Sequence, residues 1–183
     1  MVFKSAFRRM VFLLAVSNVL FASVALAADK PDLSVPSGIP KLEIAFADPQ
    51  TWNGKRIPVA LQCVKRGGVK PVLSPELKIS GSPAATKDLV VFFNDPRAFN
   101  NHGLFAYTGE PEGGVFAVPG VTSSSAKLGK DVALFQGGSR WGFAYSAPCP
   151  LNSMQHHFTV MVYARDAAGI VIAVGETSVG YAE

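Results

Sequence analysis

The stretch SPELKISGSPAATKDLVVFFNDPRA, residues 74–98, predicts two β-strands joined by a tight turn. Apolar and polar side chains alternate over residues 76–80, which is the period of a half-buried strand. The tripeptide Gly-Ser-Pro that follows breaks this strand. Residues 89–93 (LVVFF) form a continuous apolar run, as in a strand that is buried on both faces of a sheet. Asp95 and the proline after it end the run, which places a carboxylate at the end of a buried strand.

Short apolar segments separated by turn residues recur along the chain, which contains 17 Gly and 13 Pro. No long stretch carries the apolar stripe of an amphipathic helix. The spacing therefore predicts an all-β fold, either a sandwich or a barrel. Besides the opening pair, strands are expected at residues 42–46, 57–61, 104–107, 158–163 and 170–174, followed by a polar C-terminal tail. Residues 123–131 are expected to form a short helical turn or a loop.

The N-terminus has the three parts of a secretory signal peptide. A basic segment is followed by the apolar residues 11–20 and by an Ala-Leu-Ala cleavage site at 25–27. We therefore expect residues 1–27 to be a signal peptide and the mature protein to be periplasmic or secreted. The alternative is an N-terminal membrane anchor, which the short apolar run disfavours. Residues 28–40 are expected to be a flexible lead-in and residues 41–183 one domain, with no membrane span in the mature chain.

The net charge gives no indication of a nucleic-acid partner. The full chain carries 17 basic and 13 acidic residues, a net charge of +4, but three of the basic residues lie in the leader. Their removal leaves a net charge of +1, and the sequence has no cluster of Lys and Arg with interleaved aromatic residues.

The two cysteines, Cys63 and Cys149, both belong to the expected mature chain. An even number of cysteines in an exported protein suggests a disulfide, and two separate buried thiols are the alternative. Two cysteines without close spacing form neither a zinc site nor a redox motif.

Three groups of short motifs follow one another along the chain. They are SPEL at 74–77, PAATK at 83–87 and DPRA at 95–98; then His102-Gly103; then APCP at 147–150, HHF at 156–158 and VYARD at 162–166. In this order and spacing, over about residues 57–175, they resemble the phosphatidylethanolamine-binding protein family. The resemblance is to the exported bacterial branch of this family, which is also called Raf kinase inhibitor-like.

The resemblance implies a Greek-key β-sandwich with a few short helices and a small pocket for anions, including phosphate-bearing head groups. It also implies a binding function without catalysis, and no cofactor is expected. The residues that the resemblance assigns to the pocket are Asp95, His102, Ala147, Pro148 and His156, with Phe158 at an aromatic position. Members of the exported branch often carry a cysteine before the first strand of the motif, so the resemblance favours a Cys63–Cys149 disulfide.

Four positions depart from the family pattern. Arg97 stands in place of a second aspartate, Gly103 in place of a tryptophan, Ala147 in place of a glycine and Phe158 in place of a tyrosine. These changes bear on the size of the pocket and on the backbone around it. Arg97 could contact a phosphate with both arms of its guanidinium, but a solvated side chain is the simpler interpretation.

The candidate residues also have purely structural interpretations. His102 and His156 could be hydrogen-bonded structural histidines, and Asp95 could simply cap the turn before proline. His157 alternates with His156 and is expected to face solvent. Aromatic residues expected in the core or at its rim are Trp52, Trp141 and Phe143.

Two other functions remain open. One is a structural or inhibitory module that binds another protein and has a degenerate pocket. The other is a metal-assisted hydrolase that uses the same His and Asp side chains. Residues 123–125 (SSS) lack the G-x-S-x-G context of a hydrolase nucleophile, and the sequence contains no glycine-rich phosphate loop.

Overall fold

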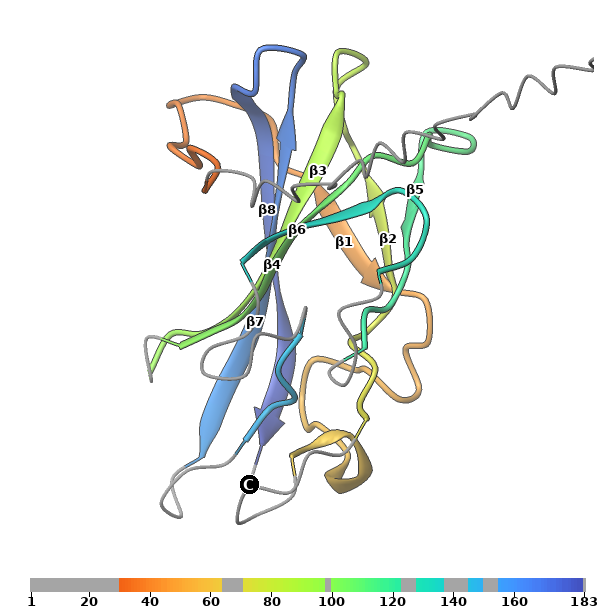
Figure 1. The fold of residues 1–183 in the computed structure, drawn as a ribbon, viewed down its shortest axis with the longest axis vertical. Helices are drawn as coiled ribbons and strands as arrows, with labels where there is room; N and C mark the ends of the chain where they lie inside the picture. Colours follow the sequence, from red (N-terminus) through yellow and green to blue (C-terminus); the bar gives the residue numbers. More distant parts are fainter. Residues whose placement is uncertain are drawn as a thin grey trace, which may run out of the picture.

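The chain folds into two antiparallel β-sheets packed face to face (Figure 1). The computed structural model describes residues 30–63, 71–97, 100–122, 128–136, 145–149 and 155–182. Within them lie β1 (Glu43–Phe46), a 3₁₀ helix η1 (Val59–Leu61), β2 (Leu77–Ser80), β3 (Asp88–Asp95), β4 (Asn100–Tyr107), β5 (Phe116–Val118), β6 (Val132–Gln136), β7 (His156–Arg165) and β8 (Val171–Ala182). The smaller sheet has the order β1-β2-β5 and the larger the order β6-β4-β3-β7-β8. The predicted all-β sandwich is confirmed.

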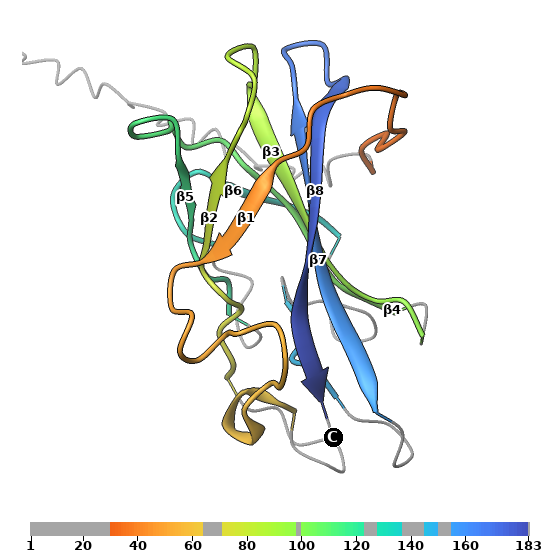
Figure 2. The ribbon, with the colours of Figure 1, turned by 180° about the vertical axis from the view of Figure 1, so that it is seen from behind.

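The main core lies between the two sheets, which Figure 2 shows from the side of β1 and β2. Because side chains alternate along a strand, every second residue of β3 and β7 points to this interior. The large sheet contributes Leu89, Val91, Phe93, Val160 and Val162, and the small sheet contributes Leu77, Ile79, Phe116 and Val118. The expected LVVFF strand thus forms the centre of the larger sheet.

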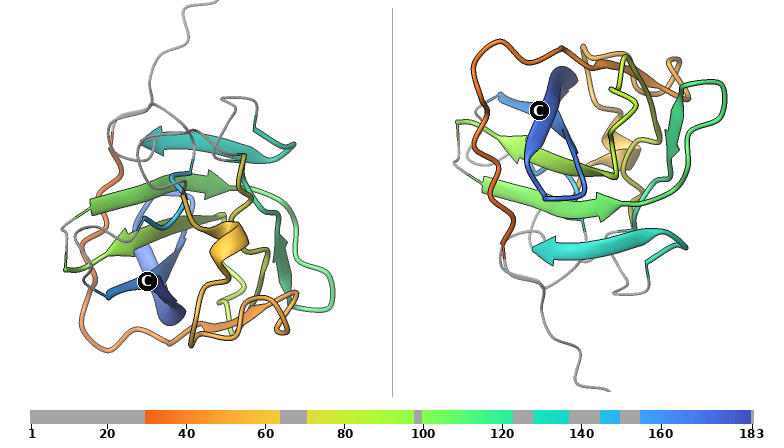
Figure 3. Two further views of the ribbon diagram at one scale, coloured as in Figure 1. Left: turned by 90° about the horizontal axis from the view of Figure 1, so that it is seen from below. Right: turned by 90° about the horizontal axis from the view of Figure 1, so that it is seen from above.

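The outer face of the large sheet is covered as well. Val90, Leu104, Tyr163 and Val171 form a second apolar cluster on this face, and Leu33 and Ile39 of the lead-in pack against it. Figure 3 shows the lead-in, in orange, passing along the side of the large sheet away from the small sheet. This cover explains why Leu89 to Val91 are buried on both faces of β3, as the continuous apolar run predicts.

Two expectations about secondary structure are wrong. Residues 57–61 were expected to be a strand, but they contain the short helix η1, because Pro58 cannot donate to a ladder and its carbonyl instead accepts the Leu61 N–H at 2.8 Å. The residues expected to be a polar C-terminal tail instead form the second half of β8. Strand β8 pairs with β7 from Val171 opposite Arg165 to Ala182 opposite His156. Strands β5 and β6 lie where no strand was expected.

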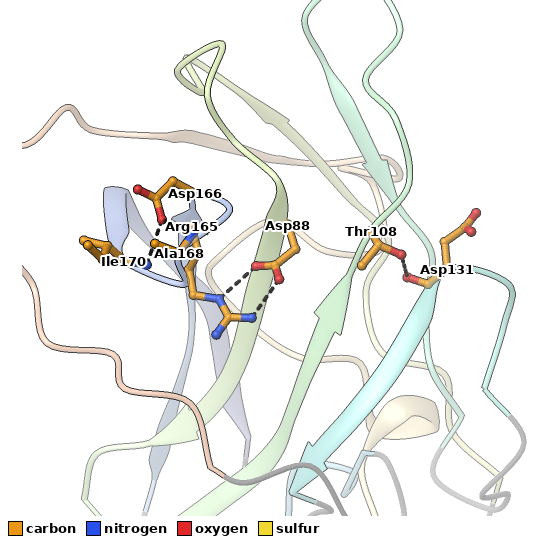
Figure 4. Close-up of polar contacts among 7 residues, drawn as sticks. All are labelled: Asp88, Thr108, Asp131, Arg165, Asp166, Ala168 and Ile170. Atoms are coloured by element: carbon orange, nitrogen blue, oxygen red, sulfur yellow. Dashed lines mark hydrogen bonds and ion pairs between the residues drawn. The ribbon is translucent and has the colours of Figure 1, made fainter.

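Both ends of the β3–β7 pair carry a carboxylate joined to a cationic or ionisable side chain. At one end, Asp88 accepts two hydrogen bonds from Arg165, at 2.8 and 2.7 Å, as Figure 4 shows. Asp166 next to it closes the β7–β8 turn by accepting the Ala168 and Ile170 N–H groups. This end is a structural clamp, and the other end holds the candidate site.

Candidate functional site

Asp95 and His156 come together because of their places on neighbouring antiparallel strands. Asp95 is the last residue of β3 and His156 the first of β7, and the two strands run side by side from Asp88 opposite Arg165 to Asn94 opposite Thr159. Asp95 continues the inward-facing series of Leu89, Val91 and Phe93. Like His102 and His156, it is buried. The alternation that builds the core therefore also delivers two polar side chains to its edge.

A short hydrogen bond joins the two side chains. His156 Nδ1 lies 2.6 Å from Asp95 Oδ2, and the side chains are only 5% and 2% exposed. The other carboxylate oxygen, Oδ1, accepts the backbone N–H of Arg97 at 3.1 Å. Because a carboxylate accepts hydrogen bonds, His156 Nδ1 carries the proton. Nε2 is then the ring nitrogen that can bind another group.

Nε2 of His156 is buried and, among the described residues, has no hydrogen-bond partner. A buried polar atom without a partner costs about 1–3 kcal/mol, so such atoms are uncommon in folded proteins. The ring is fixed from behind by Asp95, which leaves this one nitrogen free to bind another group.

His102 reaches the same interior through a β-bulge. Phe93 pairs with Gly103 and Asn94 pairs with Asn101, so His102 is an extra residue in β4. Gly103 has a φ of +146°, a conformation that L-residues with side chains rarely adopt, and its N–H donates to Asn101 Oδ1 at 2.7 Å. The glycine that departs from the family pattern is thus the residue that this bulge requires.

The backbone of Ser146 holds His102 on two sides. His102 Nδ1–H donates to the Ser146 carbonyl at 2.9 Å, and the Ser146 N–H donates to the His102 carbonyl at 2.7 Å. Burial lowers the pKa of His102 below its ordinary value, and the Ser146 bond and the charge of Asp95 oppose this effect only in part. At neutral pH the lowered pKa favours a neutral His102 ring, and the Ser146 bond favours a proton on Nδ1, which makes Nε2 a hydrogen-bond acceptor.

Phe158 supplies an apolar ring to the site, and the segment from Ala147 to Cys149 follows Ser146, the residue bonded to His102. The Phe158 ring meets His102 edge to face, at 5.0 Å between centroids, and lies 6.4 Å from His156. Ala147 and Pro148 are buried, and the Pro148 carbonyl accepts the Cys63 N–H at 2.9 Å. Cys63 and Cys149 form a disulfide, as the resemblance suggested.

The structure thus brings four of the six candidate residues into contact, namely Asp95, His156, Phe158 and His102. Ala147 and Pro148 are buried and follow Ser146, the residue bonded to His102. Arg97 lies outside this group: the side chain is exposed, and its guanidinium donates to the Gln155 carbonyl at 3.2 Å. His157 faces away from the site, but it is half-buried, with Nε2 2.9 Å from Ser178 Oγ and its ring stacked on Tyr181.

Sequence reasoning missed Ser146. It acts through its backbone N–H and carbonyl, which every residue except proline possesses, so no side-chain signal could have revealed it. Trp52 is buried in the core as expected, whereas Trp141 and Phe143 lie outside the described residues. Within the ranges that the structure covers, no three His, Cys, Asp or Glu side chains gather closely enough to hold a metal ion.

Residues 47–181 match the family model described as phosphatidylethanolamine-binding protein. The chain belongs to the phosphatidylethanolamine-binding protein family. The match includes every candidate site residue from Asp95 to Phe158. A comparison with curated protein sequences found no match.

Two crystal structures of phosphatidylethanolamine-binding protein (PEBP) relatives share the fold. One is the putative PEBP homologue CT736 of Chlamydia trachomatis, with a TM-score of 0.53 and 20% identity over 78% of this chain and 97% of that one. The other is YbcL of Escherichia coli, described as a member of the mammalian PEBP family, with a TM-score of 0.53 and 18% identity over 78% of this chain and 98% of that one. At this identity the likeness establishes the PEBP fold.

Proposed function

We propose that this protein is an exported, non-enzymatic binding protein whose pocket at His156 holds a small oxyanion, such as the phosphate of a head group. The observation that carries the proposal is the buried Nε2 of His156, which has no partner among the described residues. A bound oxygen atom would satisfy this nitrogen and remove its desolvation cost.

The hydrogen bonds around the two histidines favour a phosphate-like ligand. His156 Nδ1 is bonded to Asp95, so a ring that also carries a proton on Nε2 would donate a charge-assisted hydrogen bond from Nε2–H to an anionic oxygen. His102 is neutral, and its Nε2 can accept a hydrogen bond from a protonated ligand oxygen. Hydrogen phosphate and phosphate monoesters carry both kinds of oxygen, and Phe158 would pack against the rest of the ligand.

The polar groups of the site favour binding over catalysis. Asp95 is occupied by His156 and by the Arg97 N–H, and His102 Nδ1 is held by Ser146. Residues 123–125 (SSS) lack the G-x-S-x-G context of a hydrolase nucleophile, which also favours binding through hydrogen bonds.

Export is supported by two features. The sequence begins with the three parts of a signal peptide, and the Cys63–Cys149 disulfide is of the kind that persists in oxidising compartments. In the part of the chain that the structure describes, no helix is long and apolar enough to span a membrane.

A pair of substitutions at His156 tests the proposed binding function. The amide nitrogen of Asn can replace Nδ1, so His156→Asn keeps the hydrogen bond to Asp95 but removes Nε2. We expect calorimetry to show that the oxidised wild type binds inorganic phosphate and phosphoethanolamine. The His156→Asn variant should bind both at least about tenfold more weakly, the value of one charge-assisted hydrogen bond.

His157→Asn is the matched control, because His157 is the next residue of β7 and faces away from the site. This variant should bind both ligands as the wild type does. The proposal is wrong if the wild type binds neither ligand, or if His156→Asn binds them with unchanged affinity.

A further inference from the structure

The segment Tyr145–Cys149, which we call the wall segment, belongs to neither sheet, yet its Ser146 is hydrogen-bonded to His102 of the candidate site. At its first residue, the buried Tyr145 ring meets Phe93 edge to face, with 5.2 Å between centroids. At its last residue, Cys149 is bonded to Cys63, and the Cα atoms of the two cysteines are 5.1 Å apart. The described wall segment is thus held at both ends, by packing at one and by a covalent bond at the other.

Between these ends lies the residue that orients His102. The Ser146 carbonyl accepts the His102 Nδ1–H and so determines which ring nitrogen is protonated. Two residues further on, the Pro148 carbonyl accepts the Cys63 N–H. The disulfide, the wall segment and His102 therefore form one continuous chain of contacts from the edge of the molecule to the pocket.

We propose that the Cys63–Cys149 disulfide is a redox-controlled tether of the pocket: its reduction releases the wall segment from Cys63, loosens His102 and weakens anion binding. The part about anion binding rests on the function proposed above. Neither cysteine is a residue of a strand, and both are only partly buried, with Cys63 packed against the margin of the main core. We therefore expect the loosening to be local and the sandwich to stay folded.

The reductant is a dithiol, either a small molecule or a protein with two neighbouring cysteines. One of its thiolates attacks a sulfur of the Cys63–Cys149 bond and forms a mixed disulfide, while the other cysteine leaves as a thiolate. The second thiolate of the reductant then attacks the mixed disulfide and releases the remaining cysteine. The protein gains two electrons and two protons and ends with two thiols, while the dithiol becomes a disulfide.

One feature favours reduction of this bond. Both cysteines are partly exposed, so a reductant can approach the disulfide.

The experiment compares three forms of the protein: oxidised wild type, wild type reduced with a dithiol and kept without oxygen, and the Cys63→Ser, Cys149→Ser double variant. Phosphate affinity is measured by ³¹P NMR titration, which tolerates the reductant. We expect the two forms without the bond to bind phosphate about 5- to 10-fold more weakly, with the far-ultraviolet circular dichroism of the oxidised protein. Equal affinity in all three forms would overturn the proposal.

A second readout separates the tether from the binding function. Imidazole ¹⁵N shifts report which nitrogen of His102 carries the proton, with no ligand present. We expect protonation at Nδ1 in the oxidised protein and a mixture of the two tautomers after reduction. If the oxidised protein binds no phosphate but the tautomers still change, the proposed function fails and the tether holds. If the tautomers stay unchanged on reduction, the tether is wrong.

Discussion

Removal of the Asp95 carboxylate should destabilise the fold more than removal of any comparable acid on the same strand. In Asp95→Ala, His156 Nδ1–H and the Arg97 N–H both lose their acceptor. The Asp95–His156 pair is almost fully buried, with exposures of 2% and 5%, so water cannot replace the carboxylate. Leaving a buried donor without an acceptor costs about 1–3 kcal/mol, so the loss of both bonds should lower the free energy of unfolding by about 3–5 kcal/mol.

Asp95→Asn should cost less, about 1–2 kcal/mol, because the amide can still make both contacts. Its oxygen can accept the Arg97 N–H, and its NH₂ can donate to His156 Nδ1 if the proton of that ring moves to Nε2. The order of stability should therefore be wild type, then Asn, then Ala.

Asp88 provides the matched control, since it lies at the opposite end of β3 and pairs with Arg165. The side chains of this pair are 17% and 13% exposed, so water can partly solvate the partner that is left. Asp88→Ala should cost about 1–2 kcal/mol. Urea unfolding, followed by tryptophan fluorescence with the disulfide intact, measures all of these variants. The reasoning is refuted if Asp95→Ala costs no more than Asp88→Ala.

Three further predictions concern the surroundings of the pocket. Gly103→Ala should lower the free energy of unfolding by about 1–3 kcal/mol, because the φ of this residue is +146°. Gly129 lies in open space, so Gly129→Ala should not destabilise the fold. Equal effects of the two substitutions in urea unfolding would contradict the role of Gly103 in the bulge. Burial lowers the pKa of His102, so below about pH 6.5 the unfolded chain takes up a proton that the folded protein does not bind. The free energy of unfolding should consequently fall as the pH drops from 6.5 towards the folded pKa, and His102→Asn should make this fall shallower; an unchanged pH profile would show that His102 titrates normally. Arg97→Ala should change the free energy of unfolding by less than about 0.5 kcal/mol, since the side chain is exposed, and a loss above about 1 kcal/mol would show a structural role.

The sequence was most informative where one local pattern decided the structure. The LVVFF run predicted a buried strand, and the structure has one there. The family resemblance, rather than any local pattern, indicated that Asp95 and His156 belong to one site. The sequence was misleading where tertiary pairing decided the structure. Glu176 to Ser178 read as a polar tail, but β7 offers a partner along its whole length, and the chain continues as a strand.

Other features of the site leave no trace in a single sequence. Gly103 was recognised as unusual, but the bulge that requires it becomes visible only in the register between β3 and β4. The role of Ser146 depends on backbone atoms that are common to nearly all residues. The free nitrogen of His156 is apparent only once Asp95 is seen to occupy the other one.

The most direct test of the central claim follows the imidazole nitrogens of all three histidines by ¹⁵N NMR while inorganic phosphate is added to the oxidised protein. His157 is an internal reference, because its Nε2 bonds to Ser178 on the face away from the pocket. We predict that the Nε2 resonance of His156 shifts to a protonated, hydrogen-bonded value and saturates with phosphate, while the resonances of His157 stay in place. A His156 Nε2 resonance that does not respond to phosphate would contradict the account.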